Sequence, residues 1–438
     1  MRKLLLTIFA IAGVCALSAQ TPKHIEWYLN TKRTNKYLES GVYHASRGKG
    51  TIEFVGKKST PAIGVRKNYP AAENTRKGDY WLMTIPVEKI KAGTAIDLYF
   101  PFLAEPYDST HDFAFEYLEG KHWKGVMPTD KNGVNCQSTT AKRSPRILWR
   151  TIRLEKGIKN GNLLVRLRLC DKDVTKSSLY GSTSGQAPKI AILDERMPSD
   201  TTRVLFIGNS YTYCNLYPMQ MKELAWYEGH YLDCALYFHG GYTMKQHLAD
   251  NVSRETVELG GFEKAFLQDQ SLSTLRIGTA LDENVAGELS KMMARVKQYS
   301  PNVKCIYEMT WGRRSGKEAT DSKKIQPLVQ AHPEYFTDYF AMQKVITANA
   351  TAMAQELGLE LSPVGVAWEI VRRERPDIEL YMKDCTHPSD AGSYLAAAVG
   401  YLTLFKTPFK ANTPIRLNPE VAKYLRSVAE RVVLKGEK

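Results

Sequence analysis

The segment Arg203–Tyr213 constrains this chain more than any other stretch. Residues 204–207 form an uninterrupted apolar run, which is typical of a strand buried on both faces of a parallel sheet. Gly208 ends the run, and Asn209 and Ser210 follow before helix-compatible sequence begins. Ser210 is therefore predicted at the carboxyl edge of a sheet and at a helix N-terminus, where α/β proteins bind ligands and developing negative charge is stabilised.

A serine hydroxyl is a weak nucleophile at neutral pH, so it needs a base, an orienting carboxylate and an oxyanion site. The segment Asp384-Cys385-Thr386-His387-Pro388 carries a carboxylate and an imidazole three residues apart, just before an Ala-rich helix. One loop is therefore predicted to supply both His387 and Asp384 to Ser210.

Strands and helices alternate after residue 200. The apolar runs predict strands at 204–207, 232–238, 262–267, 303–309 and 359–364, and helices at 218–228, 283–299, 335–357 and 389–404, the last being the closing helix. Such alternation predicts a parallel sheet. Because the carboxyl ends of parallel strands meet at one edge, the polar residues that follow each strand are expected to converge there.

The residues after these strands suit an acyl-transfer site. Glycines follow the second strand, and a glycine lets a backbone N–H approach an oxyanion without a blocking side chain. Glutamines follow the third strand and offer side-chain amides. The candidate oxyanion donors are therefore a backbone amide of Gly241 or Gly240 and a side-chain amide of Gln270 or Gln268, and the possible substrate contacts are Gln268, Trp311, Tyr211 and Gly240. An ordinary turn is the alternative for the glycines, and core packing is the alternative for Trp311.

The order and spacing of these motifs resemble those of the SGNH (GDSL-like) hydrolase superfamily. The motifs are Gly208-Asn209-Ser210, Gly241 after the second strand, an amide after the third, and Asp384-x-x-His387 before a last helix. The resemblance covers residues 203–409, and the segments 267–271 and 310–311 resemble a subgroup of exported proteins from gut Bacteroidetes. It implies a flavodoxin-like three-layer α/β/α domain with Ser210 as nucleophile, His387 as base and Asp384 as orienter. It also implies that the Ser210 amide, Gly241 and Gln270 are the oxyanion donors.

Two positions depart from the family pattern. Asn209 stands where Asp is usual, and Gln270 stands where the third motif usually has Asn. A glutamine side chain is longer by one methylene, so its amide reaches about an ångström or more further than the usual one.

The first half of the chain has a different pattern. Short runs of alternating apolar and polar residues, at 51–55, 80–85, 95–100, 113–117 and 163–169, predict an all-β, jelly-roll-like sandwich. The predicted domains are a signal segment at 1–20, a β-sandwich accessory domain at 21–199 and a catalytic domain at 200–438. Such accessory domains bind carbohydrate through exposed aromatic residues, although core positions are expected for most of Trp27, Tyr28, Tyr107, Trp123 and Trp149.

Residues 1–20 have the form of a secretory signal, with a basic start, a short apolar run and small residues near Ala19. We expect export to the periplasm or the extracellular space, with no transmembrane segment. Anchoring as a lipoprotein through Cys15 is a weaker alternative. The other six cysteines are too sparse for a disulfide scaffold and are expected to be mostly free, buried thiols. No metal-binding motif is present, and the predicted chemistry needs no metal or organic cofactor.

The formal net charge of +14 lies mainly in the first half. About 30 Lys and Arg stand against about 19 Asp and Glu between residues 20 and 200. For an exported protein this field favours an acidic polysaccharide over nucleic acid as partner. A well-solvated surface is the equally weighted alternative.

These patterns predict a secreted serine ester hydrolase of the carboxylic ester class, above all a carbohydrate O-acetyl esterase acting on an acylated carbohydrate or another small ester. One alternative is a lipase, lysophospholipase or thioesterase, which requires a long apolar acyl channel. The other is a catalytically degenerate glycan-binding protein, which Asn209 and Gln270 motivate.

Overall fold

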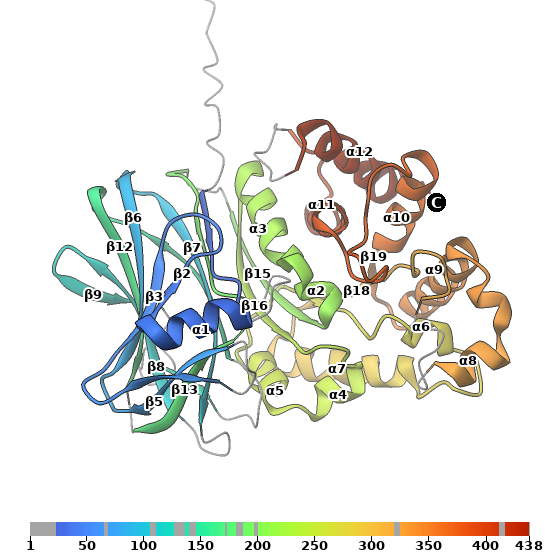
Figure 1. Ribbon diagram of the computed structural model, residues 1–438. Helices are drawn as coiled ribbons and strands as arrows, with labels where there is room; N and C mark the ends of the chain where they lie inside the picture. The colour runs from blue at the N-terminus through green and yellow to red at the C-terminus, as the bar shows by residue number, and fades with distance from the viewer. Residues whose placement is uncertain are drawn as a thin grey trace, which may run out of the picture.

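The computed structural model describes residues 23–64, 69–105, 111–126, 136–139, 146–170, 173–180, 187–196, 200–318, 325–410 and 417–437 (Figure 1). The predicted signal segment, the junction at Pro198 and Tyr107 lie outside these residues. Antiparallel strands predominate up to residue 196, and helices alternate with parallel strands from residue 200 onward. The structure is therefore mixed α/β, with most of its strands in antiparallel sheets.

Two seven-stranded antiparallel sheets form the N-terminal part. The first has the order β1-β14-β7-β13-β5-β4, with β11 also paired to β7. Its strands are β1 (Lys23–Glu26), β14 (Lys189–Ile192), β7 (Ala95–Glu105), β13 (Val174–Leu179), β5 (Pro70–Thr75), β4 (Thr60–Ile63) and β11 (Arg146–Arg153). The second has the order β10-β8-β12-β6-β3-β2, with β9 paired to β8. Its strands are β10 (Cys136–Thr139), β8 (His111–Glu119), β12 (Ile158–Leu169), β6 (Tyr80–Ile90), β3 (Thr51–Val55), β2 (Val42–His44) and β9 (His122–Gly125).

The alternating sequence pattern explains how the two sheets pack. In the second sheet, every other residue of β12 is buried from Leu163 onward, and the first three of these lie opposite buried residues of β6, as in the pair Val165 and Met83. Residues of the first sheet, including Leu98 and Phe100, belong to the same apolar core. The two sheets therefore bury one common core between them.

The core interpretation of the N-terminal aromatic residues is correct for Trp27 and Trp149, which are buried. Trp123 is partly exposed, and the Arg166 guanidinium lies 3.9 Å from its ring centroid. Tyr28 is partly buried, and its hydroxyl donates to Glu26.

Helix α1 (Thr31–Ser40) contradicts the prediction that this part contains strands alone. The Asn30 side chain caps the helix by accepting a bond from the Arg33 amide, and Gly41 ends it in a left-handed conformation. Only Thr34 and Tyr37 of the helix are buried. With so few apolar residues the helix leaves no periodic signal in the sequence, and its boundaries depend on the two caps.

A five-stranded parallel sheet organises the C-terminal part, as predicted, with the order β16-β15-β17-β18-β19. The strands are β15 (Asp200–Gly208), β16 (His230–Phe238), β17 (Lys264–Leu267), β18 (Lys304–Glu308) and β19 (Glu360–Ser362). Strand β15 begins at Asp200 rather than Val204, because its polar first residues pair with β16. From one edge of the sheet to the other, the strands are therefore the second, first, third, fourth and fifth of this sheet in chain order.

Helices cover both faces of the parallel sheet (Figure 1). Val204 and Phe206 of β15 belong to one apolar cluster, together with residues of α3, α10, α11 and α12. Leu205 and Ile207 belong to another, together with residues of α7 and α9. The uninterrupted apolar run therefore has the predicted cause, which is burial of the strand on both faces.

The helices of the C-terminal part are α2 (Ser210–Tyr213), α3 (Tyr217–Glu228), α4 (Met244–Ala249), α5 (Asn251–Glu258), α6 (Ser273–Arg276), α7 (Val285–Tyr299), α8 (Gln326–Ala331), α9 (Tyr339–Glu356), α10 (Val364–Glu374), α11 (Asp390–Phe405) and α12 (Pro419–Lys435), with short 3₁₀ turns at Cys214–Leu216 and Pro333–Phe336. The prediction that α11 closes the chain was wrong, because α12 packs against it. Helix α10 was also not predicted. Within the described ranges, no helix has both the length and the apolar character needed to cross a bilayer.

Five cysteines form no disulfide, as predicted: Cys170, Cys214, Cys234, Cys305 and Cys385. Cys214, Cys234 and Cys305 are buried, whereas Cys170 and Cys385 are partly exposed.

The two parts are joined through a buried ion pair. The Lys222 ammonium of α3 lies 3.0 Å from the Asp97 carboxylate of β7, and both side chains are almost fully buried. Asp97 also accepts bonds from the Trp149 indole at 2.8 Å and from the Thr151 hydroxyl at 2.7 Å. Burial opposes the charge of Lys222, but attraction to Asp97 outweighs it and raises the Lys222 pKa above its usual range.

Replacing one partner is expected to leave the other charge buried and unpaired. We expect Asp97→Ala to lower the free energy of unfolding by about 3–5 kcal/mol, measured by urea denaturation. Asp173→Ala is the control, because Asp173 forms an exposed pair with Arg76 and such pairs contribute little. Equal unfolding midpoints for the two variants would contradict the role of Asp97.

Candidate active site

Ser210 lies where the sequence predicted it, at the first position of α2, directly after β15. Gly208, two residues before Ser210, lets Thr212 lie close to the backbone, since a Cβ at position 208 would collide with the Thr212 hydroxyl. Ser210 is partly exposed, although most of its neighbours are buried. The serine is therefore presented at the carboxyl edge of the parallel sheet.

The Asn209 side chain joins three loops at this edge. Its oxygen accepts from the Tyr211 amide at 3.2 Å, which caps α2. Its Nδ2 donates to the Tyr242 carbonyl and to the Asp269 carbonyl, both at 3.1 Å. The amide thus explains why Asn stands where the family usually has Asp, because a carboxylate has no proton for these two carbonyls.

Gln268 lies beneath the Ser210 turn instead of facing a substrate. Its side chain is buried, and its Oε1 accepts from the Asn209 amide at 3.1 Å and from the Thr212 hydroxyl at 2.9 Å. Its Nε2 donates to the Asp269 carbonyl. Gln268 was expected to contact substrate, but its bonds give it a positioning role. The sequence pattern of a strand does not predict the direction in which a side chain of the following loop points.

The Asp384 and His387 side chains form the expected pair. Asp384 Oδ2 lies 2.6 Å from His387 Nδ1, and Oδ1 accepts from the amides of Thr386 and His387, each at 3.0 Å. Burial of Asp384 disfavours its charge, but these hydrogen bonds outweigh burial and lower its pKa to about 2. The ionised Asp384 carboxylate is bonded to His387 Nδ1, which leaves His387 Nε2 to take up and release a proton.

The Ser210 turn and the His387 loop are fastened together. The Asn215 side chain donates to the Pro388 carbonyl at 2.8 Å and to the Ser393 hydroxyl at 3.2 Å. The Ser393 hydroxyl donates in turn to the Cys214 carbonyl at 3.1 Å. Two segments that are more than 170 residues apart in the chain therefore share one hydrogen-bonded boundary.

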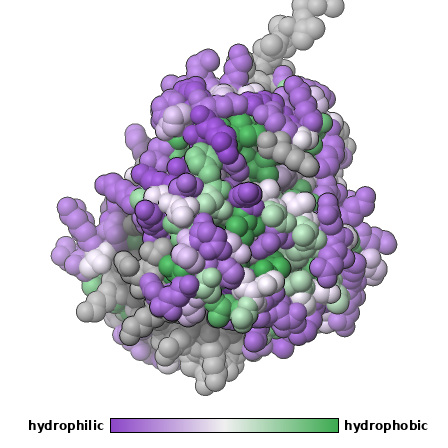
Figure 2. Space-filling model, turned by 90° about the vertical axis from the view of Figure 1, so that its right-hand side faces the viewer, coloured by the Kyte–Doolittle hydropathy of each residue, from purple (hydrophilic) through white to green (hydrophobic). Residues whose placement is uncertain are grey.

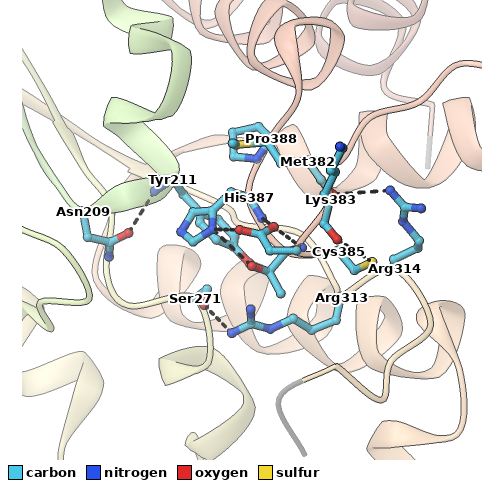
Figure 3. Close-up of polar contacts among 12 residues, drawn as sticks. Asn209, Tyr211, Ser271, Arg313, Arg314, Met382, Lys383, Cys385, His387 and Pro388 are labelled. Atoms are coloured by element: carbon cyan, nitrogen blue, oxygen red, sulfur yellow. Dashed lines mark hydrogen bonds and ion pairs between the residues drawn. The ribbon is translucent and has the colours of Figure 1, made fainter. Parts of the chain in front are cut away.

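An aromatic column supports this boundary. The Tyr211 ring stacks on Trp311 at 4.5 Å between centroids, and Trp311 stacks on Trp368 at 4.1 Å. The Trp311 indole donates to the Thr386 carbonyl, and the Tyr211 ring meets the His387 ring at 5.7 Å (Figure 3). Tyr211 was expected to contact substrate, and Trp311 was expected either to contact substrate or to pack in the core. Both are buried, so they support the His387 loop from within.

The structure contains no hydrogen bond between the Ser210 hydroxyl and the His387 ring. Their loops meet instead through the Tyr211 ring, which belongs to the residue after Ser210. Catalytic hydrogen bonds are often long without substrate and tighten in the reactive complex.

The predicted oxyanion donors lie on neighbouring loops. The His239 amide donates to the Gly208 carbonyl at 3.2 Å, which holds the loop carrying Gly240 and Gly241 beside the end of β15. Both glycines are exposed, and Gly241 has a positive φ of 71° with open space around it. Within the described residues, the amides of Ser210 and Gly241 have no acceptor in the protein, so both can donate to a ligand.

Gln270 is folded back on its own loop. Its Oε1 accepts from the Leu272 amide at 2.8 Å, and its Nε2 lies 3.4 Å from the Ser271 hydroxyl. The longer side chain of Gln thus closes a local turn. Its Nε2 donates only one long bond within the protein.

Asp269, between the two glutamines, is a buried carboxylic acid that the sequence prediction left without a role. Its Oδ1 accepts from the amides of Met244 and Gln270 and from the Ser273 hydroxyl. Burial raises the Asp269 pKa to about 6, and these bonds limit the rise. Asp269 therefore links the start of α4 to the loop after β17.

Other residues of the site were also missed. Asn215 and Ser393 fasten the two loops, and Arg313, on the loop after β18, reaches Ser271. An arginine in the loop that follows a buried strand was a usable signal in the sequence, whereas nothing there pairs Asn215 with Ser393. Among the residues that the structure describes, no group of His, Cys, Asp and Glu side chains is arranged to hold a metal ion.

Several solved structures are similar to this chain. A DUF4886 family protein from Bacteroides uniformis is 17% identical, with a TM-score of 0.44, over 55% of this chain and 97% of its own. A GDSL-like lipase from Parabacteroides merdae is 14% identical, with a TM-score of 0.33, over 47% and 96%. A family two carbohydrate esterase from Clostridium thermocellum is 12% identical, with a TM-score of 0.31, over 81% and 97%.

No protein-family model and no curated protein matches the chain. The likeness to the SGNH (GDSL-like) hydrolases rests on the motifs of the sequence.

The bonds of Asn209 predict the effect of restoring the usual aspartate. Asn209→Asp loses both bonds to the Tyr242 and Asp269 carbonyls and buries a charge beside them, so we expect the free energy of unfolding to fall by about 1–3 kcal/mol or more. Asn302→Asp, at an exposed turn, makes the same chemical change as a control in urea denaturation. Equal stability of the two variants would show that the amide bonds are dispensable.

Asp269 predicts a pH-dependent stability. Its pKa is higher in the folded protein, at about 6, than its ordinary value of 3.8, so its favourable contribution is complete below pH 3.8 and is lost as the pH rises through 6. The stability of Asp269→Asn relative to wild type is therefore expected to rise by up to about 3 kcal/mol between pH 4 and pH 7. Urea denaturation at several pH values measures the difference, and a pH-independent difference would refute the assignment.

Proposed function

We propose that this protein is a serine ester hydrolase of the SGNH type. The observation that carries the proposal is the Asp384–His387 pair on a loop fastened to the Ser210 turn at the carboxyl edge of the parallel sheet. The strand order of that sheet, second, first, third, fourth and fifth, supports a flavodoxin-like three-layer domain at residues 200–438. The shared core of the antiparallel sheets supports a β-sandwich accessory domain at residues 21–199.

The proposed mechanism is acyl transfer in two steps. His387 Nε2 takes the proton of the Ser210 hydroxyl as its oxygen attacks the ester carbonyl, and Asp384 stabilises the imidazolium. The amides of Ser210 and Gly241 hold the oxyanion, with the Gln270 side chain as a third donor. The alcohol leaves with the proton from His387, and a water molecule activated by the same imidazole then releases the acid and restores Ser210.

A short acyl group on a carbohydrate is the proposed substrate. The stack of Tyr211, Trp311 and Trp368 fills the space behind the His387 loop, which favours an acetyl group over a long acyl chain. The predicted export and the predicted sandwich domain favour an extracellular or periplasmic carbohydrate.

Figure 2 shows apolar side chains gathered near the centre of the face that carries α9 and α10, with hydrophilic side chains around them.

Loss of the nucleophile tests the proposal. We expect Ser210→Ala to lower kcat/KM for p-nitrophenyl acetate by at least about a thousandfold, because the remaining groups cannot form the acyl-enzyme. The control is Ser427→Ala, on the exposed face of α12, which is expected to retain wild-type activity.

The wild-type result separates the rival functions. No turnover by the wild-type protein would favour a glycan-binding protein. A rate that rises steadily from acetyl to octanoyl esters would favour a lipase or thioesterase.

A further inference from the structure

Arg313 is a cation at the candidate active site for which the proposed mechanism has no use. Its loop follows β18 and is fixed from two sides, since the Gly312 amide donates to the Gln343 side chain at 2.8 Å and the Tyr381 hydroxyl donates to the Gly312 carbonyl at 2.7 Å. The Arg314 amide donates to the Cys385 carbonyl at 3.0 Å, within the His387 loop. The position of Arg313 is therefore set by the same loop that positions His387.

The Arg313 side chain turns toward the nucleophile side of the site. It runs below His387 toward Ser271 in Figure 3, and its Nη2 donates to the Ser271 hydroxyl at 3.3 Å. Burial raises the Tyr211 pKa, while the Arg313 charge opposes that rise and the Asp384 charge adds to it. Arg313, Tyr211 and Asp384 thus share one electrostatic environment.

Arg313 has no counter-ion in the part of the chain that the structure describes. Its side chain is only partly exposed, and among the described residues no carboxylate lies within 4.0 Å of it. Its Nε is buried and has no acceptor. The neighbouring Arg314 differs, because it pairs with Glu379 at 2.7 Å. A half-buried guanidinium that donates to one hydroxyl has N–H donors left without acceptors. Its planar pair of parallel N–H donors matches the two oxygens of a carboxylate.

We propose that Arg313 selects esters that carry a carboxylate close to the acylated hydroxyl, as an O-acetylated acidic sugar does. The inference rests on the proposed esterase function and adds the class of alcohol that the site prefers. The carboxylate of the sugar supplies the counter-ion that the described residues do not provide, and the acetyl group lies at Ser210. The excess of basic residues in the first half of the chain suits the same kind of polymer.

Matched pairs of substrates test the inference. One member is a methyl uronoside with a single acetyl group, placed on each ring hydroxyl in turn, and the other is the neutral hexoside acetylated at the same position. We expect wild type to prefer the acidic member by about ten- to a hundredfold in kcat/KM. Arg313→Gln is expected to bring this ratio close to one. Arg313→Lys, which keeps the charge without the fork, is expected to retain an intermediate ratio.

The control removes a positive charge away from the site. Arg373→Gln, on α10, breaks a pair with Glu369 at the surface and is expected to keep the wild-type ratio. If wild type hydrolyses p-nitrophenyl acetate but shows equal ratios in Arg313→Gln and wild type, the inference is overturned and the esterase proposal stands. If wild type hydrolyses none of the esters, the esterase proposal fails, and the inference fails with it.

Discussion

The arrangement of the site depends on hydrogen bonding between polar groups buried at the carboxyl edge of the parallel sheet. Asn209 and Gln268 are removed from water, and each pays its desolvation by bonding to a neighbouring loop. These bonds fix the turn that carries Ser210 before any substrate arrives. Chemistry of this kind requires groups held in advance at the position where charge develops.

The sequence predicts best where one local requirement dominates. Burial of β15 on both faces demands an apolar run, and the turn at Gly208 demands a residue without a side chain, so both were predictable. The direction of loop side chains depends on partners far along the chain. The sequence therefore left Trp311 open between substrate contact and core packing, and the structure stacks it between two other rings. Helix α12 was missed although its buried residues recur at helical spacing.

Support for His387 comes from its own loop and from two others. Asp384, on the same loop, sets the ring from one side, and Tyr211, which follows the nucleophile, meets it from another. The loop after β18 adds a third connection through the Trp311 indole. A local motif of four residues is thus sufficient to recognise the pair, whereas its orientation requires strands that are distant in the chain.

The ion pair between Lys222 and Asp97 has a consequence for how this protein can change over time. Trp226 and Tyr227, near Lys222 on α3, pack with Ala95 and Leu193 of the N-terminal part. An accessory module on a flexible linker can be exchanged or lost by recombination, because neither side depends on the other. Here the interface between the N-terminal and C-terminal parts belongs to the folded interior, so the two parts are constrained to be inherited together.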